Sequence, residues 1–134
     1  MAIAQNGIQI YWNENYSFLI PASTNKMSDI FSFSETTVQA SVEVKANTGG
    51  TPASGDTVEF YLLATIGNPD NVSDIEYAST DHGIFLATLD TNTDNPAVKI
   101  ITIPMPLLGG IIYAKSNASA NSITISTIIL EQTA

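Results

Sequence analysis

The chain has 134 residues, the length of one domain, and its composition excludes several classes of protein. It contains no cysteine, so disulfides, thiolate nucleophiles and thiolate metal sites are excluded, and synthesis in a reducing cytoplasm is expected. Thirteen acids face four lysines and no arginine, which gives a net charge of −9. Such a surface repels phosphate backbones, so we expect no nucleic-acid partner.

The sequence contains no recognisable secretion or membrane segment. The N-terminal residues MAIAQNGIQIYW lack the basic start, apolar block and cleavage site of a signal peptide. The longest apolar region, 100–114, is interrupted by prolines and glycines, so it offers no continuous run of the roughly 18 residues that span a membrane. Only 13% of the residues are charged, which suggests that other protein covers part of the surface.

Short candidate strands begin near the N-terminus, at residues 7–12, 16–20 and 30–34. Residues 22–31 are compatible with one helical turn. The clearest strand is VQASVEVKA at 38–46, where valine and alanine alternate with polar residues in strict period two. Because successive side chains of a strand point to opposite faces, this pattern predicts a half-buried antiparallel strand.

The second half of the chain continues the same organisation. Further strands are predicted at 57–65, 83–89, 97–103, 110–115 and 122–130. The connections are rich in glycine, proline, serine and asparagine, the residues that form turns. Many short strands joined in this way are typical of an all-β sandwich or barrel. We predict one β domain, residues 1–134, with eight or nine strands.

The segment LDTNTDNPA at 89–97 has the composition of a calcium loop. Asp90, Asn92 and Asp94 occupy the first, third and fifth positions of a helix–loop–helix site, but the glycine at position 6 and the glutamate at position 12 are replaced by Asn95 and Ile101. Turn chemistry alone accounts for every residue, so we interpret the segment as a turn. The alternative is calcium bound between loops, with ligands borrowed from Asp70, Asp74 or Asp81.

Candidate catalytic groups are few. His82 is the single histidine, and no nucleophile elbow accompanies it, so a Ser–His–Asp site and the usual zinc sites are not expected. The carboxylates lie mostly in turns or on the polar phase of strands, as solvated groups do. We therefore predict no enzyme activity and no cofactor.

Two apolar features are candidates for contacts. Trp12 with Tyr11 and Tyr16 forms either a platform for a sugar ring or, as we prefer, one core residue and one edge or contact residue. The apolar connection IPMPLLGGIIYA at 103–114 either closes the end of a sandwich, which we prefer, or docks on another protein. The predicted interface residues are Trp12, Met105, Leu107 and Leu108.

The order of segments from residue 55 to residue 132 resembles small structural proteins of tailed-bacteriophage virions. The resemblance rests on GDTVEFYLLAT (55–65), IFLATLDTNTDN (84–95), VKIITIPMPLLGGIIYAKSNAS (98–119) and SITISTIILEQ (122–132). It implies an antiparallel, jelly-roll-like β-sandwich of about eight strands. It also implies assembly as a homo-oligomer, of which trimers are a common form, and brings no catalytic residues.

These observations predict a virion structural protein, most simply a capsid decoration or cement protein that binds the major capsid protein or other virion proteins and stabilises the assembled shell. A phage tail or fibre component is one alternative. Another is a carbohydrate-binding, adhesin-like module that uses Asp and Asn loops, calcium and exposed aromatic rings. No membrane partner is expected in any of these roles.

Overall fold

The computed structural model describes residues 4–64, 83–103 and 109–134. These ranges contain ten strands and no helix, and all strand pairs are antiparallel. The strands are β1 (Ala4–Gln9), β2 (Ser17–Ile20), β3 (Asn25–Met27), β4 (Phe31–Ser32), β5 (Thr37–Thr48), β6 (Thr57–Ala64), β7 (Ile84–Asp90), β8 (Ala97–Ile103), β9 (Gly109–Ser116) and β10 (Ile123–Thr133).

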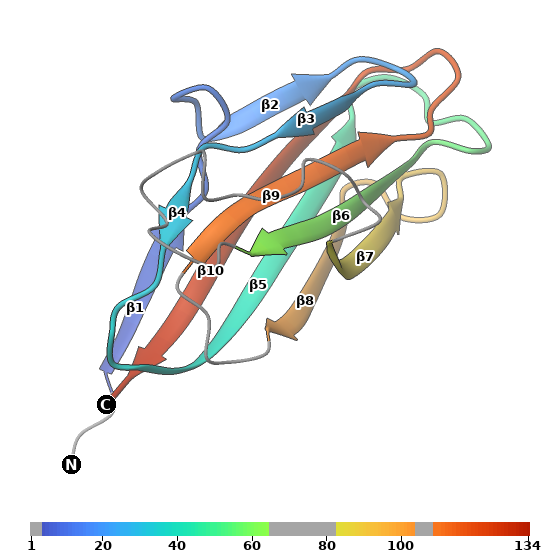
Figure 1. Ribbon diagram of the computed structural model, residues 1–134. Coiled ribbons are helices and arrows are strands. Elements are labelled where there is room, and N and C mark those ends of the chain that lie inside the picture. The colour runs from blue at the N-terminus through green and yellow to red at the C-terminus, as the bar shows by residue number, and fades with distance from the viewer. Residues whose placement is uncertain (1–3, 65–82, 104–108) are drawn as a thin grey trace.

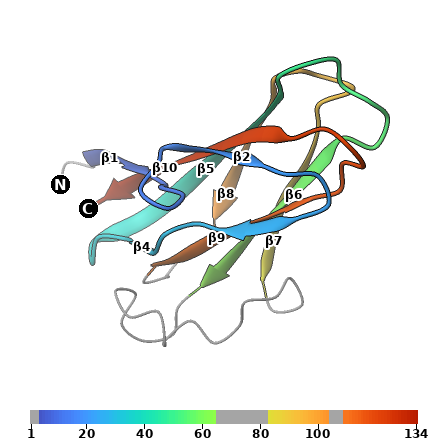
Figure 2. The ribbon, with the colours of Figure 1, turned by 90° about the horizontal axis from the view of Figure 1, so that it is seen from above.

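The strands form two sheets that pack face to face (Figures 1 and 2). The first, here called the β5 sheet, has the order β1-β10-β5-β8, and β2 also pairs with β10. The second, the β6 sheet, has the order β3-β9-β6-β7, and β4 also pairs with β9. The predicted all-β antiparallel sandwich is therefore confirmed.

The pairing is nested in the manner of a jelly roll. The first strands (β1 and β2) pair with the last (β10), the next (β3 and β4) with β9, then β5 with β8, and finally β6 with β7. Because β1 and β2 lie end to end along β10, and β3 and β4 along β9, the ten strands occupy eight strand positions. A long antiparallel hairpin rolled into two four-stranded layers gives this order, so the jelly-roll-like prediction of about eight strands is confirmed.

A tight turn separates β1 from β2. Trp12 N–H donates to the Asn15 carbonyl (2.6 Å), and Asn15 N–H donates back to Trp12 (3.1 Å). Asn13 and Glu14 between them have φ of 52° and 70°, the left-handed conformation that a two-residue turn requires. The Asp29 carboxylate accepts both of their N–H groups at 3.2 and 3.0 Å. This turn directs the Trp12 ring into the space between the sheets.

The core lies between the sheets and follows the predicted alternation. In β5, Ala40, Val42, Val44 and Ala46 are buried, whereas their neighbours are not. Ile123, Ile125 and Ile129 of β10 pack against them. Burying a side chain of this kind stabilises the fold by roughly 1.5–3 kcal/mol, so the central pair β5–β10 is the main hydrophobic layer of its sheet.

One sequence prediction of local structure is wrong. Residues 22–31 contain no helical turn; Asn25–Met27 form strand β3 and pair with Lys115, Ala114 and Tyr113 of β9. A single helical turn has little stability by itself, whereas an extended segment beside β9 gains a ladder of backbone hydrogen bonds. In the described ranges no helix exists that is long and apolar enough to cross a membrane.

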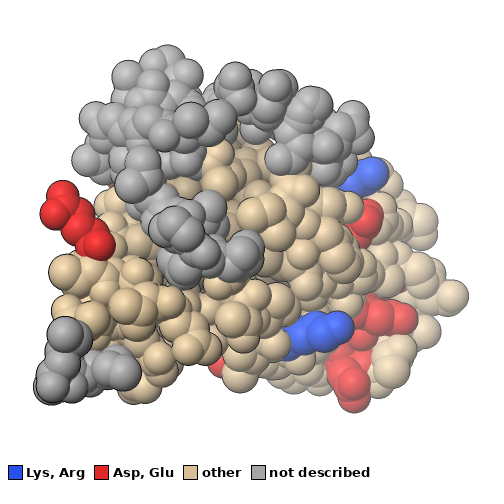
Figure 3. All heavy atoms as spheres, turned by 60° about the horizontal axis from the view of Figure 1, so that its bottom comes forward, with Lys and Arg blue, Asp and Glu red and all other residues tan. Residues whose placement is uncertain are grey.

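Four connections meet at one end of the sandwich, to the right in Figure 1, and Asp56 joins three of them. Its Oδ2 accepts hydrogen bonds from Ala53 N–H (2.9 Å) and Asn121 Nδ2 (2.7 Å), and its carbonyl accepts Thr91 N–H (3.1 Å). Elsewhere the surface carries few charges. Among the described residues on the face displayed in Figure 3, uncharged ones predominate, and the few lysines lie beside acids.

Candidate functional site

A row of aromatic side chains crosses the outer face of the β6 sheet. Tyr113 of β9 lies opposite Tyr61 of β6, and Tyr61 lies opposite Phe85 of β7. On the other side of Tyr113, Met27 of β3 extends the row to a fourth strand. Directly opposed residues in antiparallel strands point to the same face, so these side chains stand together. We call Tyr113, Tyr61 and Phe85 the aromatic row.

A β-bulge places Phe85 in this row. The register between β6 and β7 shifts between Phe60 and Tyr61, so that Phe60 opposes Ala87 while Tyr61 opposes Phe85. Leu86 and Ala87 are consequently both buried, and the alternation of β7 is reversed beyond them. Without the extra residue, Phe85 would share the inward phase of Ala87 and Leu89. Bulges commonly re-aim a side chain at functional surfaces.

The rings contact one another edge to face. The ring centroids of Tyr61 and Phe85 are 5.5 Å apart, with an interplanar angle of 66°, and those of Tyr61 and Tyr113 are 6.2 Å apart, with an angle of 69°. Tyr113 is buried with Leu63 and Ile111 in a small cluster separate from the main core. Phe85 remains 55% exposed and Met27 42% exposed. Tyr113 is therefore held in place by its neighbours, whereas Phe85 at one end and Met27 beyond the other end are accessible to a ligand.

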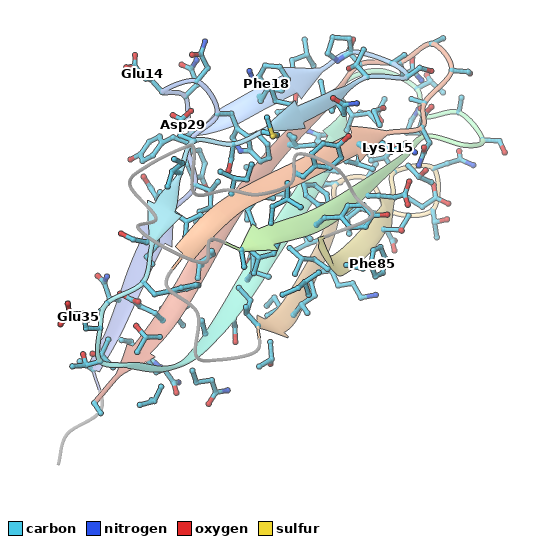
Figure 4. All side chains as sticks on the ribbon, viewed as in Figure 1. Glu14, Phe18, Asp29, Glu35, Phe85 and Lys115 are labelled. Carbon is cyan, nitrogen blue, oxygen red and sulfur yellow. The ribbon has the colours of Figure 1, made fainter. Side chains whose placement is uncertain are left out.

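A polar row runs beside the aromatic one. Lys115 of β9 lies opposite Glu59 of β6, with Asn25 and Thr88 as their outer partners. Glu59 Oε1 accepts a hydrogen bond from Tyr61 Oη (2.9 Å), and its Oε2 accepts one from Asn117 Nδ2 (2.9 Å). Figure 4 shows Phe85 and Lys115 on strands of this sheet. Carboxylate, ammonium, amide and hydroxyl groups thus adjoin the rings.

The hydrogen bonds fix the protonation of the site. The hydrogen bond from Asn117 lowers the pKa of Glu59 below its ordinary value; burial opposes this, while Tyr61 and Lys115 reinforce it. Burial, followed by the bond to Glu59, raises the pKa of Tyr61. Glu59 is therefore an ionised acceptor at neutral pH, and the Tyr61 hydroxyl keeps its proton. The Tyr61 hydroxyl therefore donates to the Glu59 carboxylate at neutral pH.

This arrangement is suited to binding. An apolar strip beside hydrogen-bonding groups matches a ligand with one apolar face and a polar rim. Within residues 4–64, 83–103 and 109–134, no three His, Cys, Asp or Glu side chains gather closely enough to hold a metal ion.

The segment that resembles a calcium loop forms a turn that is held by its own first residue. Asp90 Oδ1 accepts the N–H of Asn92 (2.9 Å), and Oδ2 accepts the hydroxyl of Thr93 (3.1 Å). The N–H groups of Thr93 and Asp94 donate to the Asp90 carbonyl. Both carboxylate oxygens of Asp90 therefore serve the turn, which is the interpretation that the sequence favoured.

The structure describes one of the four predicted interface residues, Trp12. Trp12 is 0% exposed and belongs to the main core, so the expectation that it contacts a neighbour is corrected: the turn after β1 turns its ring inward. It also forms no platform with Tyr11 and Tyr16, which are exposed. The other candidates lie outside the described residues: Met105, Leu107, Leu108, His82, Asp70, Asp74 and Asp81.

Sequence reasoning missed the aromatic row itself. Tyr61 and Tyr113 are 52 positions apart, and only the β6–β9 register places them side by side. Phe85 carries a misleading local pattern, because Phe85, Ala87 and Leu89 alternate as if all three faced the core. The available indication was the density of aromatic residues in three predicted strands, which does not reveal the face on which they stand.

Comparisons with known proteins give likeness of shape only. No protein-family model matches the chain, and no curated protein matches it in sequence. Among solved structures, the C-terminal family 6 carbohydrate-binding module of a marine laminarinase from Zobellia galactanivorans is similar at 10% identity and a TM-score of 0.48, over 97% of this chain and 99% of that one.

Two further structures have comparable similarity. A family 29 carbohydrate-binding module in complex with mannohexaose is 12% identical with a TM-score of 0.46, over 97% of this chain and 80% of that one. A pilus structure of Bacillus endospore appendages is 11% identical with a TM-score of 0.43, over 98% and 88%. At such identities and TM-scores the function has to be argued from the residues of this chain.

Proposed function

We propose that this chain is a non-catalytic β-sandwich module that binds glycan chains across the outer face of the β6 sheet. One observation carries the proposal: the edge-to-face pair of Tyr61 and Phe85 stands directly beside Glu59, which accepts hydrogen bonds from Tyr61 and Asn117 and lies opposite Lys115. This is the carbohydrate-binding alternative that the sequence offered, with a different set of aromatic residues.

The chemistry of a sugar matches both rows. A pyranose ring has apolar C–H groups on its faces and hydroxyl groups around its rim. The exposed Phe85 and the half-buried Tyr61 offer the apolar contact, and exposure of a phenylalanine to water is otherwise unfavourable. The Glu59 carboxylate can accept a hydrogen bond from a sugar hydroxyl group, and the Lys115 ammonium group can donate one to a hydroxyl oxygen.

Charge and size narrow the class of ligand. Because the chain has a net charge of −9, strongly anionic polysaccharides and nucleic acids are repelled, and neutral glycans are favoured. Met27 and Phe85, the exposed residues on either side of the buried Tyr113, lie on the first and last of four adjacent strands, three spacings of about 4.8 Å or roughly 14 Å apart. We infer that the site takes an oligosaccharide segment lying across the strands.

The experiment is a screen of the full chain on a neutral glycan array, followed by titration of the best ligand. We expect Phe85→Ala and Glu59→Gln each to weaken binding by about tenfold, which corresponds to about 1.4 kcal/mol. Tyr16→Ala is the matched control, because Tyr16 is also an exposed aromatic residue but lies outside the β6 sheet. The proposal fails if no glycan binds, or if Tyr16→Ala and Phe85→Ala have equal effects.

The virion roles implied by the resemblance stay predictions. Capsid decoration, with the major capsid protein as partner, and a tail or fibre position differ in the number of copies per particle. Counting those copies in purified particles distinguishes the two, and a chain absent from particles contradicts both.

A further inference from the structure

The outer face of the β5 sheet carries several apolar side chains that are exposed or half-buried. Its apolar members are Leu19, Val98, Ile100, Ile128 and Leu130, and Ile100 is 66% exposed. All five belong to the outward phase, since their cross-strand partners Thr124, Lys45, Glu43 and Ser41 point away from the core as well. This face is on the opposite side of the sandwich from the aromatic row (Figure 2).

A hollow of about 260 Å³ lies in this face, lined by Ser41, Glu43, Ile100, Ile128 and Leu130. On the β1 side of Leu130 the partner residue is Gly7, and a side chain there would meet nothing within 4 Å. The glycine leaves Leu130 uncovered. The face is therefore recessed between Ile100 and Leu130 and offers space for side chains from another surface.

The face is also electrically neutral in a chain of net charge −9. Among the described strand residues, Glu43 and Lys45 of the central strand β5 are the charged side chains in its outward phase. Two copies of an acidic protein repel each other through most of their surfaces. On this face the repulsion is absent, and one acid and one base stand two residues apart.

We propose that a second copy of this chain packs on the outer face of the β5 sheet, forming a two-fold symmetric, face-to-face dimer. A two-fold axis crossing the strands near Val44 sets Glu43 of one copy against Lys45 of the other, and the reverse. The same axis sets Ile100 against Val98, because Ile100 opposes Glu43 and Val98 opposes Lys45 on strand β8. The face is therefore complementary to itself in charge on β5 and in apolar contact on β8.

The size of the face agrees with a dimer. Strands of about nine residues at about 3.4 Å each, in four positions about 4.8 Å apart, give a flat area of roughly 600 Å² per copy. Two copies then cover roughly 1,200 Å², the lower end of the range for specific interfaces. In this dimer the two aromatic rows face outward in opposite directions. The dimer therefore has two identical outer surfaces, and its formation does not depend on what those surfaces bind.

The test is analytical ultracentrifugation of the full chain from roughly 1 to 500 µM. We expect a concentration-dependent dimer. Ile100→Asp should weaken dimerisation by at least tenfold, whereas Phe85→Asp, at a similarly exposed position on the opposite face, should leave it unchanged. Circular dichroism shows whether each variant is folded.

The charge pair gives an independent test that does not alter the apolar surface. Glu43→Lys and Lys45→Glu should each weaken the dimer, because like charges then meet across the axis, and the double exchange should restore it. A chain that stays monomeric throughout the range overturns the proposal. A dimer whose affinity is unchanged by Ile100→Asp and by both charge changes also overturns it. So does an oligomer that contains more than two copies.

Discussion

The ring of Phe85 rests 5.5 Å from the ring of Tyr61 on the outside of the β6 sheet, while Phe60, the residue before Tyr61, is fully buried inside. One bulge in the β6–β7 ladder produces this arrangement. The bulge exposes the ring of Phe85 to solvent, although the local sequence pattern predicts that this ring is buried. Exposed apolar surface on a rigid sheet is disfavoured unless a ligand or partner covers it.

The first prediction contrasts these two phenylalanines. Phe60→Ala should lower the free energy of unfolding by about 3–5 kcal/mol, because it opens a cavity in the main core. Phe85→Ala should lower it by about 1 kcal/mol or less, since little more than the contact with Tyr61 is lost. Chemical denaturation measures both. Equal losses would mean that Phe85 is a core residue and that the bulge is absent.

The second prediction concerns Trp12. Its ring is wholly buried, so Trp12→Ala should cost about 3–5 kcal/mol of unfolding free energy. Tyr16→Ala, in the same part of the chain but exposed, should change it by about 0.5 kcal/mol or less. Intrinsic fluorescence gives a direct check, because a buried tryptophan emits at shorter wavelength than a solvated one. A red-shifted emission from the native chain would contradict the core position.

The strands were predictable where the pattern is local. Strand β8 has the predicted bounds, 97–103, and β5 extends the predicted 38–46 by one residue before and two after. In β5 the order of apolar residues is set by burial of one face against the other sheet, whereas β8 also carries the apolar Val98 and Ile100 on its exposed face. The loops rich in glycine and asparagine ended the strands as expected, since those residues adopt turn conformations at low cost.

The candidate site was not predictable, because it depends on register. Whether Tyr61 meets Tyr113 or a residue two positions away is decided by pairing between segments far apart in sequence. Trp12 was misjudged for a related reason: two left-handed residues after it turn the chain, and Asp29, from a distant segment, holds that turn. Long-range hydrogen bonds of this kind leave no periodic pattern.

The third prediction concerns metal at the 90–96 turn. Because both Asp90 oxygens already accept hydrogen bonds from the turn, adding millimolar calcium or a chelator should leave the melting temperature unchanged. Asp90→Ala should lower the free energy of unfolding by about 1 kcal/mol, the usual cost of losing such a side-chain cap. A rise in melting temperature with calcium that Asp90→Ala abolishes would restore the calcium alternative. Differential scanning calorimetry measures these effects.

The fourth prediction follows from Glu131, which is buried near the end of β10. Its Oε1 accepts a hydrogen bond from Asn6 Nδ2 (3.0 Å), and its Oε2 accepts bonds from the Thr37 hydroxyl (2.6 Å) and Ser34 N–H (3.0 Å). Burial alone raises the pKa of this carboxyl, but the bonds from Thr37, Asn6 and Ser34 outweigh it and leave the pKa lowered from 4.5. The folded protein therefore favours the ionised form more than the unfolded chain does.

The sign of the pH dependence follows. A carboxyl with a lowered pKa in the folded state stabilises the protein above its unfolded value of 4.5, and this stabilisation is lost as the pH falls through the folded pKa. We expect the free energy of unfolding to fall below about pH 4.5 in the native chain. Glu131→Gln should be less stable at pH 7 and should lose less on acidification. Glu59, whose pKa is also lowered, contributes in the same direction. Glu59→Gln is therefore measured beside Glu131→Gln, so that the share of each carboxylate in the pH dependence of the unfolding free energy can be separated. The prediction fails if Glu131→Gln leaves the loss of unfolding free energy on acidification unchanged while Glu59→Gln removes it. In that case the carboxylate whose ionisation stabilises the fold is Glu59 of the β6 sheet, and the ionisation of Glu131 does not contribute.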